Sequence, residues 1–208
     1  MTAPAEASRA ASPATVVRAC KIALVAAVAL FFTCVAFGNI TDYDSNWQFV
    51  QHVLSMDTTF PNSKLHWRAV TDSDLQQAAY WLIMGTQAAT AVLLWLGTLS
   101  LFANIRRAEF ARARALAVAG LTVGLLLYMV GFVTIGGKWF AMSQSATWNG
   151  QQKAFEFIAM IGAVLLVLLL PEEAGSRLEF SPAAGARRRN EFLPDRGPSD
   201  APTNRLTR

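Results

Sequence analysis

The stretch ALAVAGLTVGLLLYMVGFVTI, residues 115–135, decides the fold of this chain. It holds no charged side chain and is about as long as the ~20 residues that a helix needs to cross the hydrocarbon core of a bilayer. Because that core offers no water to bond the backbone, such a stretch must fold as a helix. Three comparable apolar stretches lie at 16–37, 78–103 and 154–170. The sequence therefore predicts an all-α membrane protein, a bundle of four transmembrane helices.

The composition agrees with one membrane bundle and leaves no room for a second folded domain. Hydrophobic residues make up 53% of the 208 residues and charged residues only 15%, which is too apolar for an ordinary soluble domain. We expect the four-helix domain at 16–170, with outer loops at 38–77 and 136–153. Residues 1–15 and 171–208 are rich in small residues and proline, and are predicted to be disordered tails.

The basic residues predict the orientation of the bundle. Of the 18 lysines and arginines, all but Lys64, Arg68, Lys138 and Lys153 precede the first span, follow the fourth or separate the second from the third. The positive-inside rule then places both termini in the cytoplasm. The sequence pI is near 9.4, but these charges flank membrane spans instead of covering a soluble face. We therefore expect contact with the lipid bilayer and no nucleic-acid partner.

The start of the first span also has features of a signal peptide. Basic residues precede an apolar stretch, and Ala36-Phe37-Gly38 resembles a small-residue cleavage site. The stretch is long for a signal peptide, so the sequence favours a retained membrane anchor, with cleavage as the alternative.

The loop at 38–77 is predicted to have structure of its own, because long unstructured loops are uncommon in compact domains. Apolar residues recur at helical spacing over 46–56, which predicts a short amphipathic helix. Thr71-x-x-Asp74 resembles a capping box and predicts that the second span's helix begins outside the membrane. The structured outer loop is thus part of the predicted fold.

Side chains that can bind a ligand gather in the two outer loops. The candidates combine an imidazole, a carboxylate, a guanidinium and two indoles: His52, Asp57, Arg68, Trp139 and Trp148. An aromatic cap packed from both loops is the favoured interpretation, and a ligand-stacking site is the alternative. The spacing of the two histidines matches no metal motif, so we predict no metal site. No histidine lies in a span, which excludes a bis-histidine haem there, and no cofactor or catalytic residue is proposed.

Within the spans, polar and glycine residues are predicted to pack helices together. Gln87 suits a hydrogen bond between helices, and Gly120-x-x-x-Gly124 permits two helices to approach closely. We favour contacts inside the bundle over contacts with a second copy. Glu156 is expected to pair with Lys153 at the interface. The lack of ionisable residues at mid-membrane depth argues against active transport.

Two stretches of the chain resemble a known family. GNITDYDSNWQFVQHVLSMDTTFPNSKLHWRAV, residues 38–70, and GGKWFAMSQSATWNGQQKAFEF, residues 136–157, are similar to an uncharacterised bacterial family of predicted small integral membrane proteins, a domain of unknown function. HVLSMDTTF and TWNGQQ are the most specific parts, and the resemblance extends over 18–170. It implies four membrane helices in a bacterial inner membrane. It implies no activity and no functional residues.

These observations favour a non-enzymatic accessory or scaffolding subunit of a membrane complex, with a membrane-protein partner or a second copy of itself. Two alternatives remain open. The first is a binder of, or an enzyme for, a lipid or quinone at the outer face, which would use the five loop residues above. The second is an oligomeric passive channel or uncoupled transporter, lined by Gln87 and threonines of the spans.

Overall fold

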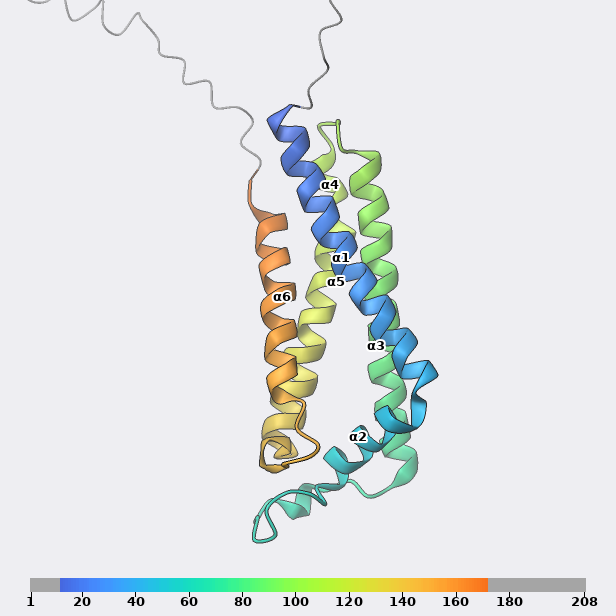
Figure 1. The fold of residues 1–208 in the computed structure, drawn as a ribbon, viewed down its shortest axis with the longest axis vertical. Coiled ribbons are helices and arrows are strands. Elements are labelled where there is room, and N and C mark those ends of the chain that lie inside the picture. Colours follow the sequence, from blue (N-terminus) through green and yellow to red (C-terminus); the bar gives the residue numbers. More distant parts are fainter. Residues whose placement is uncertain (1–11, 172–208) are drawn as a thin grey trace, which may run out of the picture. The chain divides into compact units, whose positions relative to one another are not determined.

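The computed structural model describes residues 12–171, and within them four helical segments are long and apolar enough to cross a membrane. In chain order they are α1 (Pro13–Thr41), α3 (Ser73–Ala103), a segment over Phe110–Trp139 and α6 (Gln151–Leu169). Figure 1 shows them side by side, with the short helix α2 (Tyr43–Ser55) across one end. The predicted all-α fold with four spans is confirmed. Most of both predicted tails, 1–11 and 172–208, lies outside the described residues.

The first span is longer than predicted at both ends. Ser12 is the N-cap of α1 and accepts a hydrogen bond from the backbone N–H of Thr15 at 3.3 Å, while Pro13 takes the first helical position. Residues 13–15, assigned to a disordered tail from their composition, are therefore helical. At the other end the helix continues past Gly38, whose carbonyl accepts from the N–H of Asp42 at 2.8 Å. The helix therefore extends past Gly38 and Asn39, although both residue types are common at helix ends.

The third helix begins outside the predicted span, as expected, but with a different cap. Asp72, not Thr71, is the N-cap of α3, and its carboxylate accepts from the N–H groups of Asp74 and Leu75 at 2.9 and 3.0 Å. A carboxylate at this position satisfies free N–H groups and interacts well with the helix dipole. The capping box predicted from Thr71 and Asp74 is therefore wrong: the cap is the carboxylate of Asp72 alone, because the residue three positions later is Leu75, which cannot complete a box.

The segment from Phe110 changes its winding along its length. It comprises α4 (Phe110–Ala113), α5 (Ala115–Leu126) and η2 (Leu127–Trp139), and η2 is a π-helix. Its wide turn is visible at the C-terminal end, where the N–H of Phe140 donates to the carbonyl of Ile135 at 3.0 Å. The sequence predicts a uniform α-helix to residue 135 because this stretch is apolar on every side and has no periodicity that distinguishes the two windings. The last span, α6, begins three residues before the predicted position.

Glycines bring α3 and α5 together along the half of the bundle nearest α4. A Cβ added at Gly97 would lie 2.6 Å from the backbone nitrogen of Ala117, and one at Gly120 would lie 2.9 Å from the side chain of Leu94. A Cβ at Gly124 would lie 2.6 Å from the ring of Phe32 on α1. The predicted glycine pair thus contacts helices of the same bundle. Beyond Gly124 the packing partner of this span changes from α3 to α6, because η2 packs along α6.

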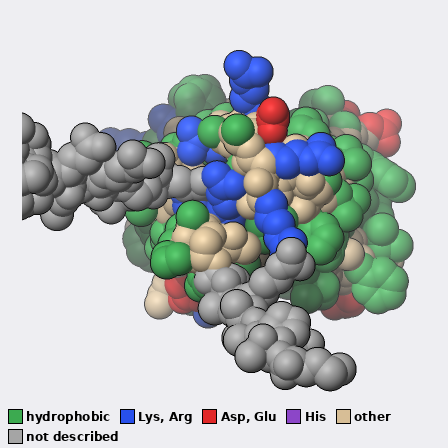
Figure 2. Space-filling view, turned by 90° about the horizontal axis from the view of Figure 1, so that it is seen from above, with side chains coloured by type: hydrophobic (Ala, Val, Ile, Leu, Met, Phe, Trp, Pro, Cys, Tyr) green, Lys and Arg blue, Asp and Glu red, His purple; other side chains and the backbone are tan. Residues whose placement is uncertain are grey.

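Basic side chains hold the helix ends at the opposite end from α2. Figure 2 looks onto this end and shows lysine and arginine side chains gathered there. Arg18 donates to the carbonyls of Ile105 and Arg107 at 3.0 and 2.9 Å, and Lys21 donates to that of Leu170 at 2.7 Å. Carbonyls near helix C-termini lack partners within the helix and carry negative partial charge. These cations therefore stabilise the bundle.

Replacing Gly97 by Ala should destabilise the bundle, because the new Cβ meets the backbone of Ala117, which has no rotamer with which to move away. We expect a loss of about 1–3 kcal/mol in the free energy of unfolding, the cost of overpacking a tight contact. The measurement is reversible unfolding of the purified protein in mixed micelles. Gly85, also on α3, is the matched control, since a Cβ there meets nothing within 4 Å. Equal losses in both variants would contradict the close contact between α3 and α5.

Candidate functional site

The two outer loops pack into one structured cap over the bundle. The cap comprises α2, the 3₁₀ turns η1 (His66–Arg68) and η3 (Met142–Gln144), and the segments that join them. The two loops are linked by the hydroxyl groups of Thr58 and Ser145, 2.8 Å apart. A cluster of apolar side chains buries the space between them: Val53, Met56, Phe140, Ala141 and Met142. The predicted amphipathic helix exists as α2, and its apolar face is held against α3 and this cluster.

His52, Asp57 and Trp148 form one group within the cap. His52 Nδ1 and Asp57 Oδ2 are 2.7 Å apart, and the imidazole stacks on the indole of Trp148 with ring centroids 4.8 Å apart. His66 does not join them, because its Nε2 bonds to the hydroxyl of Thr59 at 2.8 Å. Between residues 12 and 171 no group of three or more His, Cys, Asp or Glu side chains is placed to hold a metal ion. The polar contact within this group is the one between the imidazole of His52 and the carboxylate of Asp57.

Arg68 and Trp139 belong to a second, separate group, which we call the aromatic patch: Trp67, Arg68 and Trp139. The guanidinium lies 5.2 Å from the ring centroid of Trp67 and 4.6 Å from that of Trp139. Its Nη1 donates to the backbone carbonyl of Trp139 at 3.3 Å. Trp67 is 72% exposed and Trp139 48%. The structure therefore divides the five predicted binding residues between two separate groups, with His52, Asp57 and Trp148 in one and Arg68 and Trp139 in the other.

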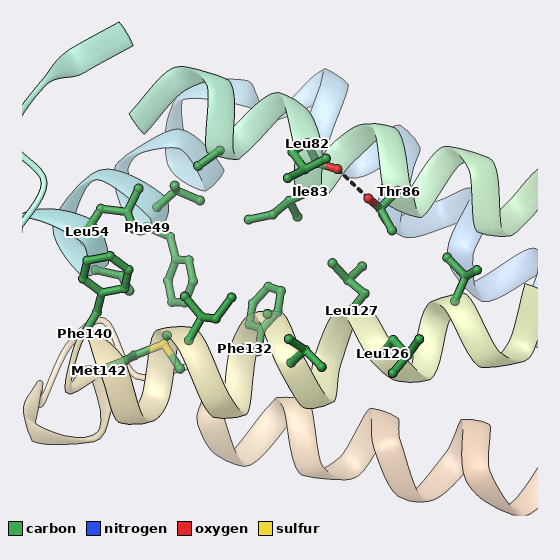
Figure 3. Close-up of a pocket in the computed structure, with 18 residues that line it drawn as sticks. Phe49, Leu54, Leu82, Ile83, Thr86, Leu126, Leu127, Phe132, Phe140 and Met142 are labelled. Carbon is green, nitrogen blue, oxygen red and sulfur yellow. Dashed lines mark hydrogen bonds between the residues drawn. The ribbon is translucent and has the colours of Figure 1, made fainter. Parts of the chain in front are cut away.

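A cavity of about 410 Å³ lies between α2, α3 and η2, and none of the five predicted binding residues lines it. Figure 3 shows Phe49 and Leu54 of α2, Leu82 and Ile83 of α3, and Phe132 of η2 around this space. The lining is almost wholly apolar. Its one hydroxyl side chain, Thr86, donates to the carbonyl of Leu82 at 2.7 Å and is thereby occupied. We call this space the apolar cavity.

A smaller cavity of about 230 Å³ adjoins the apolar cavity inside the bundle. Its lining includes amide and phenol side chains from four helical elements: Asn39, Asn46, Tyr80, Gln87 and Tyr128. We call it the polar cavity. Gln87, predicted to bond between helices, accepts from the side-chain amide of Asn39 on α1. The hydroxyl of Tyr80 donates to the backbone carbonyl of Asn39 at 2.9 Å.

Sequence reasoning found only Gln87 of this polar group. Asn39 lies just after the first apolar stretch, and Tyr80 and Tyr128 lie within apolar stretches, so none of the three stands out in the sequence as a polar residue of the bundle. The available signal is the presence of amides and phenols in apolar helices: α1, α3 and η2 each carry at least one that lines this cavity, whereas α6 contributes only Phe157. The threonine hydroxyls behave differently, because those of Thr90 and Thr98 donate to carbonyls of their own helix at 2.7 and 2.8 Å. The hydroxyl groups of Thr90 and Thr98 therefore do not contribute to a continuous polar path through the bundle.

The helical bundle, its cap and its two membrane-level cavities define a multi-pass integral membrane protein. The chain belongs to the family described as "Predicted small integral membrane protein (DUF2165)", which matches residues 17–171. The family resemblance seen in the outer loops is thereby confirmed, and the family has no assigned function. No curated protein and no solved structure matches the chain.

Replacing His52 and Asp57 together by Ala should leave the protein inserted and folded. Their side chains are 31% and 46% exposed, and surface pairs of this kind contribute about 0–1 kcal/mol. We expect normal membrane fractionation and a loss of no more than about 1 kcal/mol in unfolding free energy. Trp148→Ala is the comparison, because that ring also contacts Phe49 and its loss should cost more. Failure of the double variant to insert would show that the pair holds the cap together.

Proposed function

We propose that this protein is a non-enzymatic accessory or scaffolding subunit of a membrane complex, and that it contacts its partner protein through the aromatic patch. The observation that carries the proposal is the exposure of two indoles fixed around one guanidinium. Tryptophan and arginine are the residue types that most often dominate binding energy at protein interfaces.

The patch is ordered before any partner binds. The rings of Trp67 and Trp139 meet edge to face at 6.0 Å, and Arg68 is anchored on the backbone of the second loop. The Nε atom of Arg68 is buried and has no hydrogen-bond partner among the described residues. Because this Nε is out of reach, an acceptor from a partner would bond to the terminal nitrogens of the guanidinium and would gain a charge-assisted bond there at little cost in side-chain entropy.

Enzymatic use of the loop residues has less support. Chemistry at the outer face would need His52, Asp57, Arg68 and the indoles to converge on one pocket, whereas they form two groups that line neither cavity. A channel would need a polar path, whereas the hydroxyls of Thr86 and Thr90 are bonded to their own helix. We therefore place binding ahead of both catalysis and conduction.

The proposed location is a bacterial inner membrane with both termini in the cytoplasm. Supporting this orientation, Arg18, Lys21, Arg106, Arg107, Arg112 and Arg114 gather at the end of the bundle away from the cap. An excess of lysine and arginine marks the cytoplasmic side of membrane proteins. The cap and its aromatic patch would then face outward.

A cysteine introduced at Asn62 should report this orientation, because residue 62 lies in the cap and is exposed. In intact cells it should react with a membrane-impermeant thiol reagent. The background should replace Cys20 and Cys34 by Ser, and a cysteine at Arg106, at the other end, is the matched control that should react only after lysis. The reverse pattern would place the cap in the cytoplasm.

The partner proposal is tested by replacing Trp67 with Ala in a tagged protein expressed at its natural level. We expect one protein to co-purify in fixed stoichiometry with the unchanged chain and to be reduced about tenfold or more in the variant, as for an interface hot spot. Trp81→Ala is the matched control, since Trp81 is also an exposed indole, at 58% against 72% for Trp67, and lies on α3 outside the patch. A photoreactive residue at position 67 should attach to the same protein.

Two results would contradict the accessory role. One is a chain that purifies alone from gently solubilised membranes under conditions that preserve known complexes. The other is a stoichiometric partner whose recovery is unchanged by Trp67→Ala and Arg68→Ala, since that partner would bind elsewhere.

A further inference from the structure

The apolar cavity opens sideways, toward the bilayer. Leu82 of α3 is 72% exposed, and Leu126 and Val130 at the opposite wall are about half exposed. The opening exists because α3 packs on α5 while η2 packs on α6, so that the two walls separate toward the cap (Figure 3). Whatever occupies this cavity therefore enters from the membrane.

An apolar chain suits the apolar cavity, and water does not. A buried water needs two to four polar partners, and the hydroxyl of Thr86 is already bonded. A smaller apolar cavity of about 150 Å³ is known to stay dry and to take up benzene. An empty space of about 410 Å³ would deprive its lining atoms of dispersion contacts. A hydrocarbon chain from the surrounding bilayer restores those contacts.

The polar cavity determines which head group the hydrocarbon chain of the ligand can carry. Its polar lining consists of amides and phenols, and none of its lining residues is charged. Burying a charged head group against such side chains is costly, whereas a carbonyl or hydroxyl group can exchange hydrogen bonds with them. The lining therefore favours an uncharged head group.

The two cavities share a wall through which one molecule can extend. Phe49, Val50, Ile83 and Phe132 line both of them. Phe49 and Phe132 come from α2 and η2 and stack with ring centroids 6.2 Å apart. A shift of these two rings would open the polar cavity, which suits a head group, into the apolar cavity, which suits a hydrocarbon chain.

We propose that the two cavities form one binding site for a neutral amphiphile from the membrane, its carbonyl or hydroxyl head beside Gln87 and Asn39 and its apolar chain between α3 and η2. Diacylglycerol-like lipids and lipid quinones share this chemistry. The site uses none of the aromatic patch, so it stands or falls independently of the proposed partner interface.

The test uses two matched photoreactive probes with the full chain reconstituted in vesicles of phosphatidylethanolamine and phosphatidylglycerol at 3:1. One probe is a diacylglycerol with a diazirine in one acyl chain, and the other is phosphatidic acid with the same chains. We expect saturable labelling of residues 49–54 and 127–139 by the neutral probe. Excess dioctanoylglycerol or excess decylubiquinone should reduce this labelling by competition. The stronger of the two competitors identifies the neutral head group that binds better. Dioctanoyl phosphatidic acid should not compete.

Gly131→Leu should abolish this labelling by filling the site. A Cβ at Gly131 meets only the side chain of Leu127, at 3.7 Å, so a larger side chain extends into the apolar cavity. We expect about a tenfold loss of saturable labelling. Gly85→Leu is the matched control and should label normally, because position 85 does not line the cavity and has open space around it. Ala79→Leu fills the same cavity from α3 and serves if the first variant does not fold.

Gln87→Met tests the head-group assignment separately. Loss of one hydrogen bond should lower the ratio of neutral to anionic labelling about fivefold. Equal labelling by both probes in the unchanged protein would overturn the neutral-head assignment. Equal loss in the Gly131 and Gly85 variants, or labelling that does not saturate, would overturn the site itself. A photoreactive residue placed at position 126 gives one more test. If it attached to another protein in native membranes, a partner helix would occupy the opening, and the proposed site would be wrong.

Discussion

The close approach of α3 and α5 at Gly97 and Ala117 is the contact on which the rest of the bundle depends. Only a residue without a Cβ lets the two backbones come so near, and the following contacts at Gly120 and Gly124 keep the helices together for two more turns. After Gly124 the side chains become large and the chain adopts the wide π-helical turn. Tight contact at one end thus separates the helices at the other, and the cavities lie in that separation.

The cap forms part of the walls of both cavities between the spans. Helix α2 covers the point where α3 and η2 separate, and its Phe49 and Val50 line both cavities. The same helix carries His52, whose imidazole is stacked on an indole from the other loop. The loop between the first two spans therefore also covers the two cavities. Its two faces serve different purposes, one stabilising the cap and the other shaping the cavity.

The parts of this fold that could be predicted depend on short-range sequence properties. The length of an apolar stretch predicts a span, and the spacing of apolar residues over 46–56 predicts a short helix. Contacts between distant residues could not be found this way: Arg68 and Trp139 are 71 positions apart, and Asn39 meets Gln87 across 48. Gly97 lacks a glycine four residues away, so no motif marks it. The π-helix is hidden because its apolar residues show no periodicity.

The bond between Lys21 and Leu170 has a consequence for biogenesis. It joins the first membrane helix to the residue that caps the end of α6, and Lys21 is almost completely buried. A ribosome delivers the first three helices to the membrane before the residue that accepts this bond has been synthesised. Until Leu170 has been synthesised and α6 has docked, the ammonium group of Lys21 lacks this one hydrogen bond. The bond between Lys21 and Leu170 can therefore form only after the last span has been made, so this contact between the first and last helices comes late in assembly.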